Sequence, residues 1–318
     1  MMSKPALNIH LAGPRGFCAG VERAISIVET ALEKYGAPVY VRHEIVHNRF
    51  VVDNLRKKGA VFVEDLEGIP QHAHVIFSAH GVPKSIPEKA NRKKLNHIDA
   101  TCPLVTKVHI DAKRHNKANK TVILVGHAGH PEVVGTLGQL SEGEILLIEN
   151  TEQAENLQVP DENNLAFVTQ TTLSVDDTKE IIAILKRRFP NIVAPFKEDI
   201  CYATTNRQTA VKAISSECDA FIVVGAKNSS NSNRLAEVAK ASGCPKSILI
   251  ARASELDFNW LGNVKTLGVT AGASAPEILV QELIQTLSEE FEITLKELSQ
   301  VSEKVHFSLP NTLLNKNS

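Results

Sequence analysis

Residues 7–35 read LNIHLAGPRGFCAGVERAISIVETALEKY, an apolar run that ends in a turn containing Cys18 and continues into a longer segment. Apolar residues recur in that longer segment at the spacing of one helix face. The same order of apolar run, cysteine and helix-like segment occurs again around Cys102 and Cys201. This unit, used three times, determines the fold that the sequence predicts.

Each of the three cysteines is followed by two further apolar runs that end in polar loops. The first loops lie 29, 28 and 28 residues after the cysteine, and the second loops lie 62, 69 and 73 residues after it. The first loops contain His47, His130 and Ser229, and the second loops contain His80, Thr171 and Ser274. One unit that supplies a thiolate and two polar loops three times predicts one shared metal site. Three separately buried cysteines are the alternative, because cysteine is often part of a core.

The apolar runs are short, β-branched and apolar nearly throughout, as at Val122–Val125 and Phe221–Val224. Such runs are typical of parallel sheets that are covered on both faces. Strands that alternate with helices indicate right-handed βαβ crossovers, with ligands at the carboxyl ends of the strands. The predicted fold class is therefore α/β, with three pseudo-repeated small domains of parallel sheets and flanking helices. We expect a trefoil-like arrangement around a common centre.

The predicted domain boundaries lie just before the strand that leads into each later cysteine. The three α/β domains are expected to span residues 1–95, 96–193 and 194–282. The C-terminal segment, residues 283–318, is expected to pack on the first domain. Its last part looks less regular, and we expect the polar end, Asn311–Ser318, to be disordered.

The composition restricts the classes of function. A net charge of −1 over 318 residues provides no field for nucleic acid or a membrane surface, so neither is expected as a partner. No apolar run approaches the roughly 20 residues that span a bilayer, and Met1–Ala6 lacks the pattern of a secretory signal. Five cysteines, an odd number without an export signal, indicate a reducing compartment and metal or catalytic roles. We expect a cytoplasmic protein.

Cys18, Cys102 and Cys201 are the expected metal ligands, and the other two cysteines are not. Cys218 and Cys244 precede apolar runs and would lie at the amino ends of strands, the opposite edge of a parallel sheet. Three thiolates without a fourth ligand leave an open coordination position. This pattern fits a catalytic zinc site as well as an iron–sulfur cluster with one reactive iron, and spacing alone does not choose between them.

The loop at residues 126–132 reads GHAGHPE and places two histidines beside Glu132. Glu132 is a candidate general acid. The alternative is a carboxylate that is favoured at a helix N-terminus by the helix dipole.

The loop at residues 228–233 reads NSSNSN and precedes a predicted helix. Hydroxyls and backbone N–H groups at a helix N-terminus can bind phosphate. The alternative is an ordinary N-cap with polar neighbours. Six such residues in succession exceed what capping requires, so the loop favours anion binding. His47 and His80 would add donors or positive charge.

Two further motifs bear on the type of enzyme. Residues 43–47 read HEIVH, which fits the zinc-protease pattern, but they follow a strand-like run where that pattern needs a helix. We therefore expect no protease site there. The sequence also lacks the glycine-rich dinucleotide fingerprint and the Walker A loop. Electrons for a redox reaction would then come from a protein partner.

Motifs along most of the chain resemble the LytB/IspH family of 4-hydroxy-3-methylbut-2-enyl diphosphate reductases, in order from about residue 7 to 285. They are PRGFCAGVERAI (14–25), HNRFVVDNL (47–55), SAHGVP (78–83), DATCPLV (99–105), GHPEVVGT (129–136), TQTTLSVDDT (169–178), DICYATTNRQ (199–208), NSSNSNRL (228–235) and GVTAGASAPE (268–277). The departures are minor, such as Gly13 where the family often has Asn, and none falls at a functional position.

The resemblance implies the last step of the non-mevalonate (MEP) isoprenoid pathway, the reductive dehydroxylation of the substrate to isopentenyl and dimethylallyl diphosphate. It implies an oxygen-sensitive [4Fe–4S] cluster at the common centre, which can appear as [3Fe–4S] after oxidation, with ferredoxin or flavodoxin as electron donor. The implied cluster ligands are Cys18, Cys102 and Cys201. The implied substrate-binding residues are His47, His80, His130, Ser229, Ser230, Asn231 and Ser274. The implied catalytic residues are Glu132, which delivers protons, with Thr171 and His130.

Two other classes of function stay open from the residues alone. A non-catalytic redox sensor or cluster carrier would explain the thiolates but not the polar loops or Glu132. A hydro-lyase with a similar open cluster would explain both, but it would need no reductant.

Overall fold

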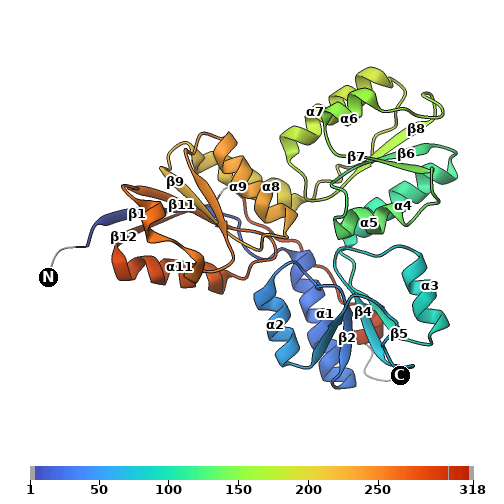
Figure 1. The fold of residues 1–318 in the computed structure, drawn as a ribbon, viewed down its shortest axis with the longest axis horizontal. Coiled ribbons are helices and arrows are strands. Elements are labelled where there is room, and N and C mark those ends of the chain that lie inside the picture. The colour runs from blue at the N-terminus through green and yellow to red at the C-terminus, as the bar shows by residue number, and fades with distance from the viewer. Residues whose placement is uncertain (1–3, 300, 315–318) are drawn as a thin grey trace. The chain divides into compact units, whose positions relative to one another are not determined.

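The computed structural model describes residues 4–299 and 301–314, which form three parallel β-sheets flanked by helices (Figure 1). The first sheet has the order β10-β9-β11-β1-β12, the second β3-β2-β4-β5 and the third β7-β6-β8. Every pairing between these strands is parallel. The predicted α/β class with repeated parallel sheets is therefore confirmed.

The strands of the first sheet are β1 (Ala6–Gly13), β9 (Ala220–Val224), β10 (Ser247–Ile250), β11 (Thr266–Ala271) and β12 (Glu292–Ser299). Those of the second are β2 (Val39–Arg42), β3 (Ala60–Val63), β4 (His74–Phe77) and β5 (Asn96–Asp99). Those of the third are β6 (Thr121–Val125), β7 (Ile145–Ile148) and β8 (Leu165–Thr169).

The same strand order recurs in all three sheets, and the segment that leads to each cysteine occupies an equivalent place. β1 pairs with β11 before Cys18, and β5 pairs with β4 before Cys102. Before Cys201, Val193 forms a parallel bridge with Ala166 of β8. Each cysteine segment therefore adds to the sheet of the preceding repeat. The relation is cyclic, because the segment before Cys18, in the first repeat, pairs with β11 of the third repeat.

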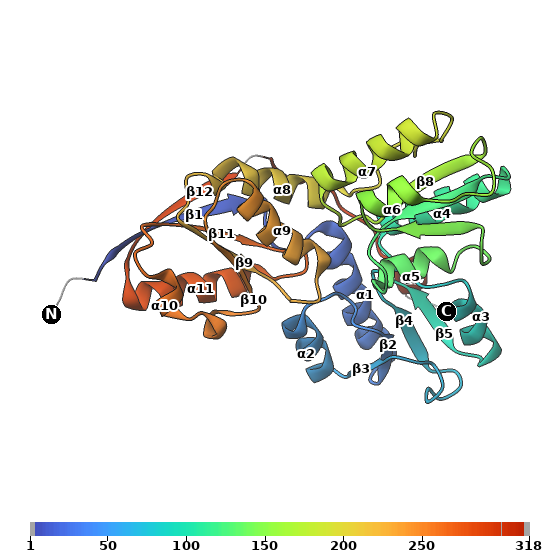
Figure 2. The ribbon, with the colours of Figure 1, turned by 45° about the horizontal axis from the view of Figure 1, so that its top comes forward.

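Helices cover both faces of each sheet (Figure 2). α8 (Tyr202–Ser215) and α9 (Ser230–Ala241) cover one face of the first sheet, and α10 (Phe258–Leu261) and α11 (Glu277–Glu290) cover the other. The second sheet has α1 (Ala19–Tyr35) and α2 (Arg49–Lys57) on one side and α3 (Ser85–Arg92) on the other. The third has α4 (Pro103–Lys117) and α5 (Pro131–Leu137) opposite α6 (Thr151–Asn156) and α7 (Val175–Arg188). A 3-10 turn, Ala253–Glu255, and a short helix, α12 (Asn311–Leu314), complete the described elements.

Burial explains why the strands read as continuous apolar runs. All five residues of β8 and all five of β9 are buried, because helices lie on both faces of each sheet. α1 instead buries one stripe that includes Ala24, Val28 and Ala31, as the helical spacing predicts.

The chain forms two compact units. The first is drawn from Met1–Cys18, His47–Arg49 and Tyr202–Val305 and contains the first sheet. The second is drawn from Ala19–Val46, Phe50–Cys201 and His306–Ser318 and contains the second and third sheets.

The sheets divide the chain differently from the predicted boundaries. The limit after residue 95 lies before β5, yet β5 pairs with β4 of the second sheet. β1 likewise belongs to the sheet of the third repeat. β5 reads NHID, with only Ile98 buried, so its composition does not show which sheet it joins.

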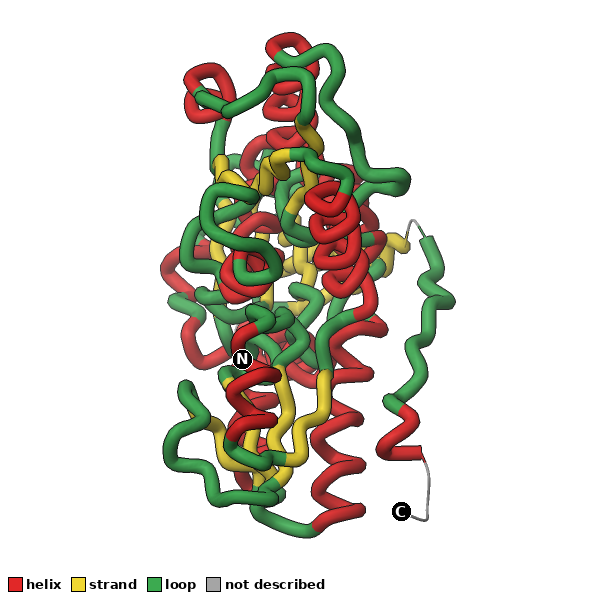
Figure 3. The backbone as a smooth tube through the Cα atoms, turned by 90° about the vertical axis from the view of Figure 1, so that its right-hand side faces the viewer, coloured by secondary structure: helices red, strands yellow, loops and turns green. Residues whose placement is uncertain are grey.

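The C-terminal segment is more ordered than predicted. β12 pairs with β1 along its whole length, whereas the later part reaches α1, where Arg23 Nε donates to the Ser308 carbonyl (2.8 Å) and Lys34 Nζ to the Thr312 carbonyl (2.8 Å). Residues 311–314 form α12, which follows a long irregular stretch (Figure 3) and corrects the prediction of disorder there. Residues 315–318 lie outside the described part of the chain.

Two other expectations concern local structure. The HEIVH segment begins at the end of β2 and continues as a loop, so the non-helical prediction is confirmed. The helix after Cys201 begins at the next residue, Tyr202, and Thr204, although polar, is buried within it. None of the described helices has the length and apolar character needed to cross a membrane.

Candidate functional site

Each of the three predicted ligand cysteines lies between a sheet and the start of a helix. Cys18 precedes α1, Cys102 is the N-cap residue of α4 and Cys201 precedes α8. All three are partly exposed. Helix N-termini favour negative charge, so these positions suit thiolates.

The backbone of each cysteine is anchored to the second polar loop of the preceding repeat. The Cys102 N–H donates to the Ala79 carbonyl (2.9 Å), beside His80. The Cys201 N–H donates to the Thr171 carbonyl (3.0 Å). The Cys18 N–H donates to the Ala273 carbonyl (3.3 Å), beside Ser274. A ligand of a cysteine and a ligand of the second polar loop of the preceding repeat would therefore be close neighbours.

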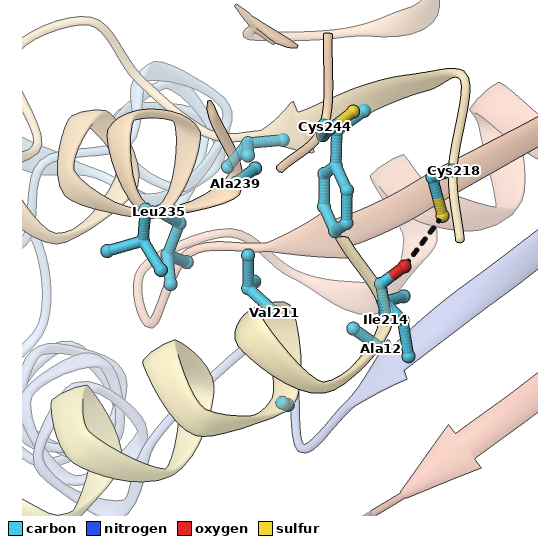
Figure 4. Close-up of a cluster of buried hydrophobic side chains, with 11 residues drawn as sticks. Ala12, Val211, Ile214, Cys218, Leu235, Ala239 and Cys244 are labelled. Carbon is cyan, nitrogen blue, oxygen red and sulfur yellow. Dashed lines mark hydrogen bonds between the residues drawn. The ribbon is translucent and has the colours of Figure 1, made fainter. Parts of the chain in front are cut away.

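The two remaining cysteines belong to the core of the first sheet, as predicted (Figure 4). Cys218 and Cys244 are each 3% exposed and precede β9 and β10. The Cys218 thiol donates to the Ile214 carbonyl (3.2 Å), and burial raises the pKa of Cys218 to about 12. Burial also raises the pKa of Cys244. Both side chains are therefore poor thiolate ligands.

Glu132 lies in the first turn of α5, buried and held by the loop after β8. Its Oε1 accepts from the Thr171 N–H (2.7 Å), and its Oε2 is 2.9 Å from the Thr171 hydroxyl, which donates to it. Thr171 in turn accepts from the Cys201 N–H through its carbonyl. One short chain of hydrogen bonds thus joins the predicted acid to a predicted cluster ligand.

The environment of Glu132 matches the requirement for a proton donor near neutral pH. Glu132 is 3% exposed, and burial raises its pKa to about 7. The two hydrogen bonds from Thr171 lower this pKa, whereas the charge of Asp199 adds to the rise. A carboxyl group that is half protonated near pH 7 can release and recover a proton within a catalytic cycle.

His130 and His80 come together from different repeats of the second unit. Their rings lie edge to face, with centroids 6.0 Å apart. The Glu132 N–H donates to His130 Nδ1 (3.2 Å), so in the neutral ring the proton is on Nε2.

The first unit brings together a second group of polar side chains. The Ser274 hydroxyl donates to the His47 carbonyl (2.9 Å), and the Asn228 amide donates to His47 Nδ1 (3.3 Å). Ser229 caps α9 and accepts from the Ser232 N–H (3.4 Å) and hydroxyl (3.0 Å). Since the Ser229 oxygen accepts both bonds, its own hydroxyl hydrogen is available to donate.

Asn231 and Ser230 complete this group in the first turn of α9. Asn231 is 4% exposed, and neither its amide nitrogen nor its amide oxygen has a hydrogen-bond partner among the described residues. Leaving such a buried group unsatisfied is costly, so a ligand that bonds to the Asn231 amide would remove that cost. Ser230 is the first residue of the same helix. The arrangement of donors around a helix N-terminus suits an anion.

The predicted site residues thus fall into two groups, one in each unit. His47, Ser229, Ser230, Asn231 and Ser274 belong to the first unit with Cys18, and His80, His130, Glu132 and Thr171 belong to the second with Cys102 and Cys201. In residues 4–299 and 301–314, no three His, Cys, Asp or Glu side chains are arranged as a complete metal site. The three-cysteine ligand set therefore stays a prediction.

Several supporting residues were not predicted as site residues. Asp199 influences Glu132 and pairs with Lys107, and Gln170 accepts from the His127 N–H (3.0 Å) beside the Glu132 loop. Asn228, which contacts His47, was recognised only as part of the NSSNSN loop. All four lie within or next to the motifs quoted above, and that proximity is the sequence signal that could have identified them.

The fold and the site define the class of protein, an α/β chain in which a strand–cysteine–helix unit is used three times. The sequence model described as LytB protein matches residues 9–288. The chain belongs to the LytB family, and the resemblance found in its motifs is confirmed.

Relatives and solved structures agree with this assignment. Proteins named 4-hydroxy-3-methylbut-2-enyl diphosphate reductase from Ruegeria sp. (strain TM1040) and Phenylobacterium zucineum (strain HLK1) are 58% and 60% identical, over 98% of this chain and 99% of theirs. The structure of E-1-hydroxy-2-methyl-but-2-enyl-4-diphosphate reductase from Plasmodium falciparum superposes with a TM-score of 0.91, at 39% identity and 98% coverage of both chains. A structure of (E)-4-hydroxy-3-methyl-but-2-enyl diphosphate reductase gives 0.63 at 33% identity, over 89% of this chain and 99% of that one.

Proposed function

We propose that this chain is a reductase that converts 4-hydroxy-3-methylbut-2-enyl diphosphate to isopentenyl and dimethylallyl diphosphate, the last step of the MEP pathway. The observation that carries the proposal is the near-complete match, at 58–60% identity, to relatives that bear this name. The reaction breaks the allylic C–O bond and consumes two electrons and two protons. One proton leaves with the hydroxyl group as water, and the other is added to the carbon skeleton.

Cys18, Cys102 and Cys201 are the proposed ligands of a [4Fe–4S] cluster, which becomes [3Fe–4S] when it is oxidised. The residues fit this group, because the three cysteines are partly exposed at helix N-termini while the two other cysteines are buried. When bound, the cluster would supply the electrons and a Lewis-acidic iron with an open position.

Glu132 is the proposed source of protons. Its carboxyl group is held by two hydrogen bonds from Thr171, which fix its orientation before the substrate binds. A preorganised acid with a pKa near 7 loses no free energy to reorientation during the reaction. Thr171 and His130 would position the substrate hydroxyl and the transferred proton.

The diphosphate is the proposed ligand of the anion-binding residues. In the first unit these are His47, Ser229, Ser230, Asn231 and Ser274, and in the second His80 and His130. Ser229 and Asn231 offer donors at the N-terminus of α9, where the helix dipole favours negative charge. His47 is fixed by Asn228, so its remaining ring nitrogen carries the proton in the neutral form.

Ferredoxin or flavodoxin is the proposed electron donor, since the sequence contains no nucleotide-binding fingerprint for a bound hydride carrier. The proposed location is the cytoplasm, because cysteines that must stay reduced require a reducing compartment.

A turnover assay with a measured reductant tests the function. Anaerobic protein is mixed with the substrate and reduced methyl viologen, and oxidised viologen is counted against the two products. The proposal predicts two electrons consumed for each molecule of product. Product formation without oxidation of viologen would identify a hydro-lyase instead, and a cluster that neither binds the substrate nor yields product would identify a redox sensor or carrier.

A further inference from the structure

Three cations occupy equivalent positions in the three repeats. Arg23 lies five residues after Cys18, Lys107 five residues after Cys102 and Arg207 six residues after Cys201. Each is therefore in the first two turns of the helix that follows its cysteine, α1, α4 or α8, all of which are labelled in Figure 1. None of the three is a predicted site residue, although Lys107 pairs with Asp199 beside Glu132.

Arg207 is fully buried and binds the loop that leads into Cys18. Its guanidinium donates to the Gly16 carbonyl through Nη2 (2.8 Å) and Nε (3.3 Å), and to the Phe17 carbonyl through Nη2 (3.3 Å). Its charge is balanced by Glu303 of the C-terminal segment, whose Oε1 is 3.0 Å from Nη1. The two carbonyls are those of the residues directly before Cys18.

Lys107 makes the equivalent contact one repeat earlier. Its ammonium donates to the Lys197 carbonyl (2.7 Å) and to Asp199 Oδ1 (2.6 Å), both in the loop that leads into Cys201. The other carboxylate oxygen of Asp199 accepts from the Thr169 N–H (2.9 Å) at the end of β8. The loop before Cys201 is thereby held between α4 and the third sheet.

Arg23 completes the set. Its Nη1 donates to the Thr101 carbonyl (3.1 Å) and the Ala100 carbonyl (3.4 Å), which directly precede Cys102. Its Nε donates to the Ser308 carbonyl (2.8 Å) of the C-terminal segment. The guanidinium also interacts electrostatically with Cys102.

The three contacts follow one cyclic rule. The helix after Cys18 holds the loop before Cys102, the helix after Cys102 holds the loop before Cys201, and the helix after Cys201 holds the loop before Cys18. The backbone N–H of each cysteine follows the same rule, since it bonds to a loop of the preceding repeat. Each cysteine loop is thus held by the preceding repeat at two points.

We propose that Arg23, Lys107 and Arg207 are three equivalent positioning residues, each of which holds the loop that carries the next cysteine. The inference rests on the proposed function, because the loops that the three cations hold carry the proposed cluster ligands. Hydrogen bonds from a charged donor to backbone carbonyls are stronger than neutral ones, so one cation can restrain a loop that contains glycine or alanine.

Hydrogen–deuterium exchange of the full-length protein, resolved by peptide, tests the proposal. The variants are Arg23→Gln, the pair Lys107→Gln with Asp199→Asn, and the pair Arg207→Gln with Glu303→Gln, so that no carboxylate is left buried without its cation. Lys34→Gln is the matched control, because Lys34 lies in the last turn of α1, at the opposite end from Cys18, and donates to the Thr312 carbonyl of the C-terminal segment.

Each variant is expected to raise exchange, by about tenfold, in its own cysteine loop and not in the other two. The affected loops are residues 100–102 for Arg23, 197–201 for Lys107 and 16–18 for Arg207. The control should leave all three loops unchanged. Unchanged exchange in the matching loop, or an equal rise throughout the chain as in general destabilisation, would overturn the proposal.

The rate of iron release, measured on two kinds of variant, connects the positioning of the cysteine loops to the cluster. Iron should be released to a chelator about tenfold faster from each cation variant, the usual effect of removing a group that orients a metal ligand. Lys107→Arg should restore the wild-type rate, since arginine serves this role in the other two repeats. Wild-type protein without iron and sulfide would overturn the proposed function, and the exchange pattern would still decide the role of the three cations.

Discussion

Glu132 is the residue on which the proposed chemistry depends most. Glu132→Gln keeps the shape and the N–H···His130 contact but removes the titratable proton. We expect turnover to fall by about 10²–10⁴-fold, with iron content and diphosphate affinity unchanged. Steady-state kinetics with reduced methyl viologen, together with metal analysis, measures both. Wild-type turnover in this variant would remove Glu132 from the mechanism.

The raised pKa of Glu132 also predicts how stability depends on pH. Because burial raises the folded-state pKa from 4.5 to about 7, the folded protein binds this proton more tightly than the unfolded chain does. The stabilisation is complete below about pH 4.5 and is lost as the pH rises through 7. The free energy of unfolding should therefore fall across this window in the wild type more than in Glu132→Gln. Urea unfolding at several pH values measures the difference, and parallel curves for the two proteins would contradict the assignment.

Asn231 allows binding to be separated from stability. Its amide is buried without a hydrogen-bond partner among the described residues, so Asn231→Ala removes an unsatisfied polar group. We expect unchanged or increased stability and about tenfold weaker binding of inorganic pyrophosphate. Thermal unfolding and calorimetric titration measure the two quantities. A loss of stability with unchanged affinity would show that Asn231 has a structural role instead.

At the scale of elements, the end of α5 packs closely against the loop after β4. A Cβ atom at Gly138 would lie 2.3 Å from Pro83 Cβ and 2.8 Å from Pro83 Cα, and the Lys84 N–H donates to the Gly138 carbonyl (3.1 Å). A Cβ atom at Gly135, one turn earlier, would lie 3.1 Å from the carbonyl carbon of Gly81. This approach orients α5, and with it Glu132 and His130.

Gly138→Ala should therefore disturb the second unit, although the φ of Gly138 is an ordinary −71°. We expect a loss of about 1–3 kcal/mol in the free energy of unfolding, the usual cost of overpacking, and reduced turnover because Glu132 shifts. Gly68→Ala is the matched control, since a Cβ there would meet nothing within 4 Å. Urea unfolding compares the two variants, and equal stabilities would show that the loop can move aside.

The sequence predicted elements well where apolar periodicity was strong and less well where polar residues serve the site. In the helix after Cys201, Thr204 is polar yet buried, so the spacing of apolar residues does not show where this helix starts. β5 pairs with β4 although the predicted boundary lies before it, because its sequence, NHID, does not specify which sheet it joins. The positions of the site residues within their loops followed from the repeat, but the bond between Glu132 and Thr171 depends on tertiary contacts between distant loops.

At the scale of the whole molecule, the cyclic relation among the three repeats explains why the chain uses one unit three times. Each sheet receives the strand that leads to the next cysteine, and each cysteine helix holds the loop before the next cysteine. The strand order, the N–H bonds of the cysteines and the three cations all obey this relation. A repeat could not be removed without leaving one cysteine loop unsupported.

The iron and acid-labile sulfide content of anaerobically purified protein shows directly whether the chain holds the proposed [4Fe–4S] cluster. A visible spectrum is recorded before and after addition of 4-hydroxy-3-methylbut-2-enyl diphosphate. The proposed function predicts nearly four iron and four sulfide per chain, as in a cubane cluster, and a spectrum that changes when the substrate binds. Zinc in place of iron, or protein without metal, would contradict it.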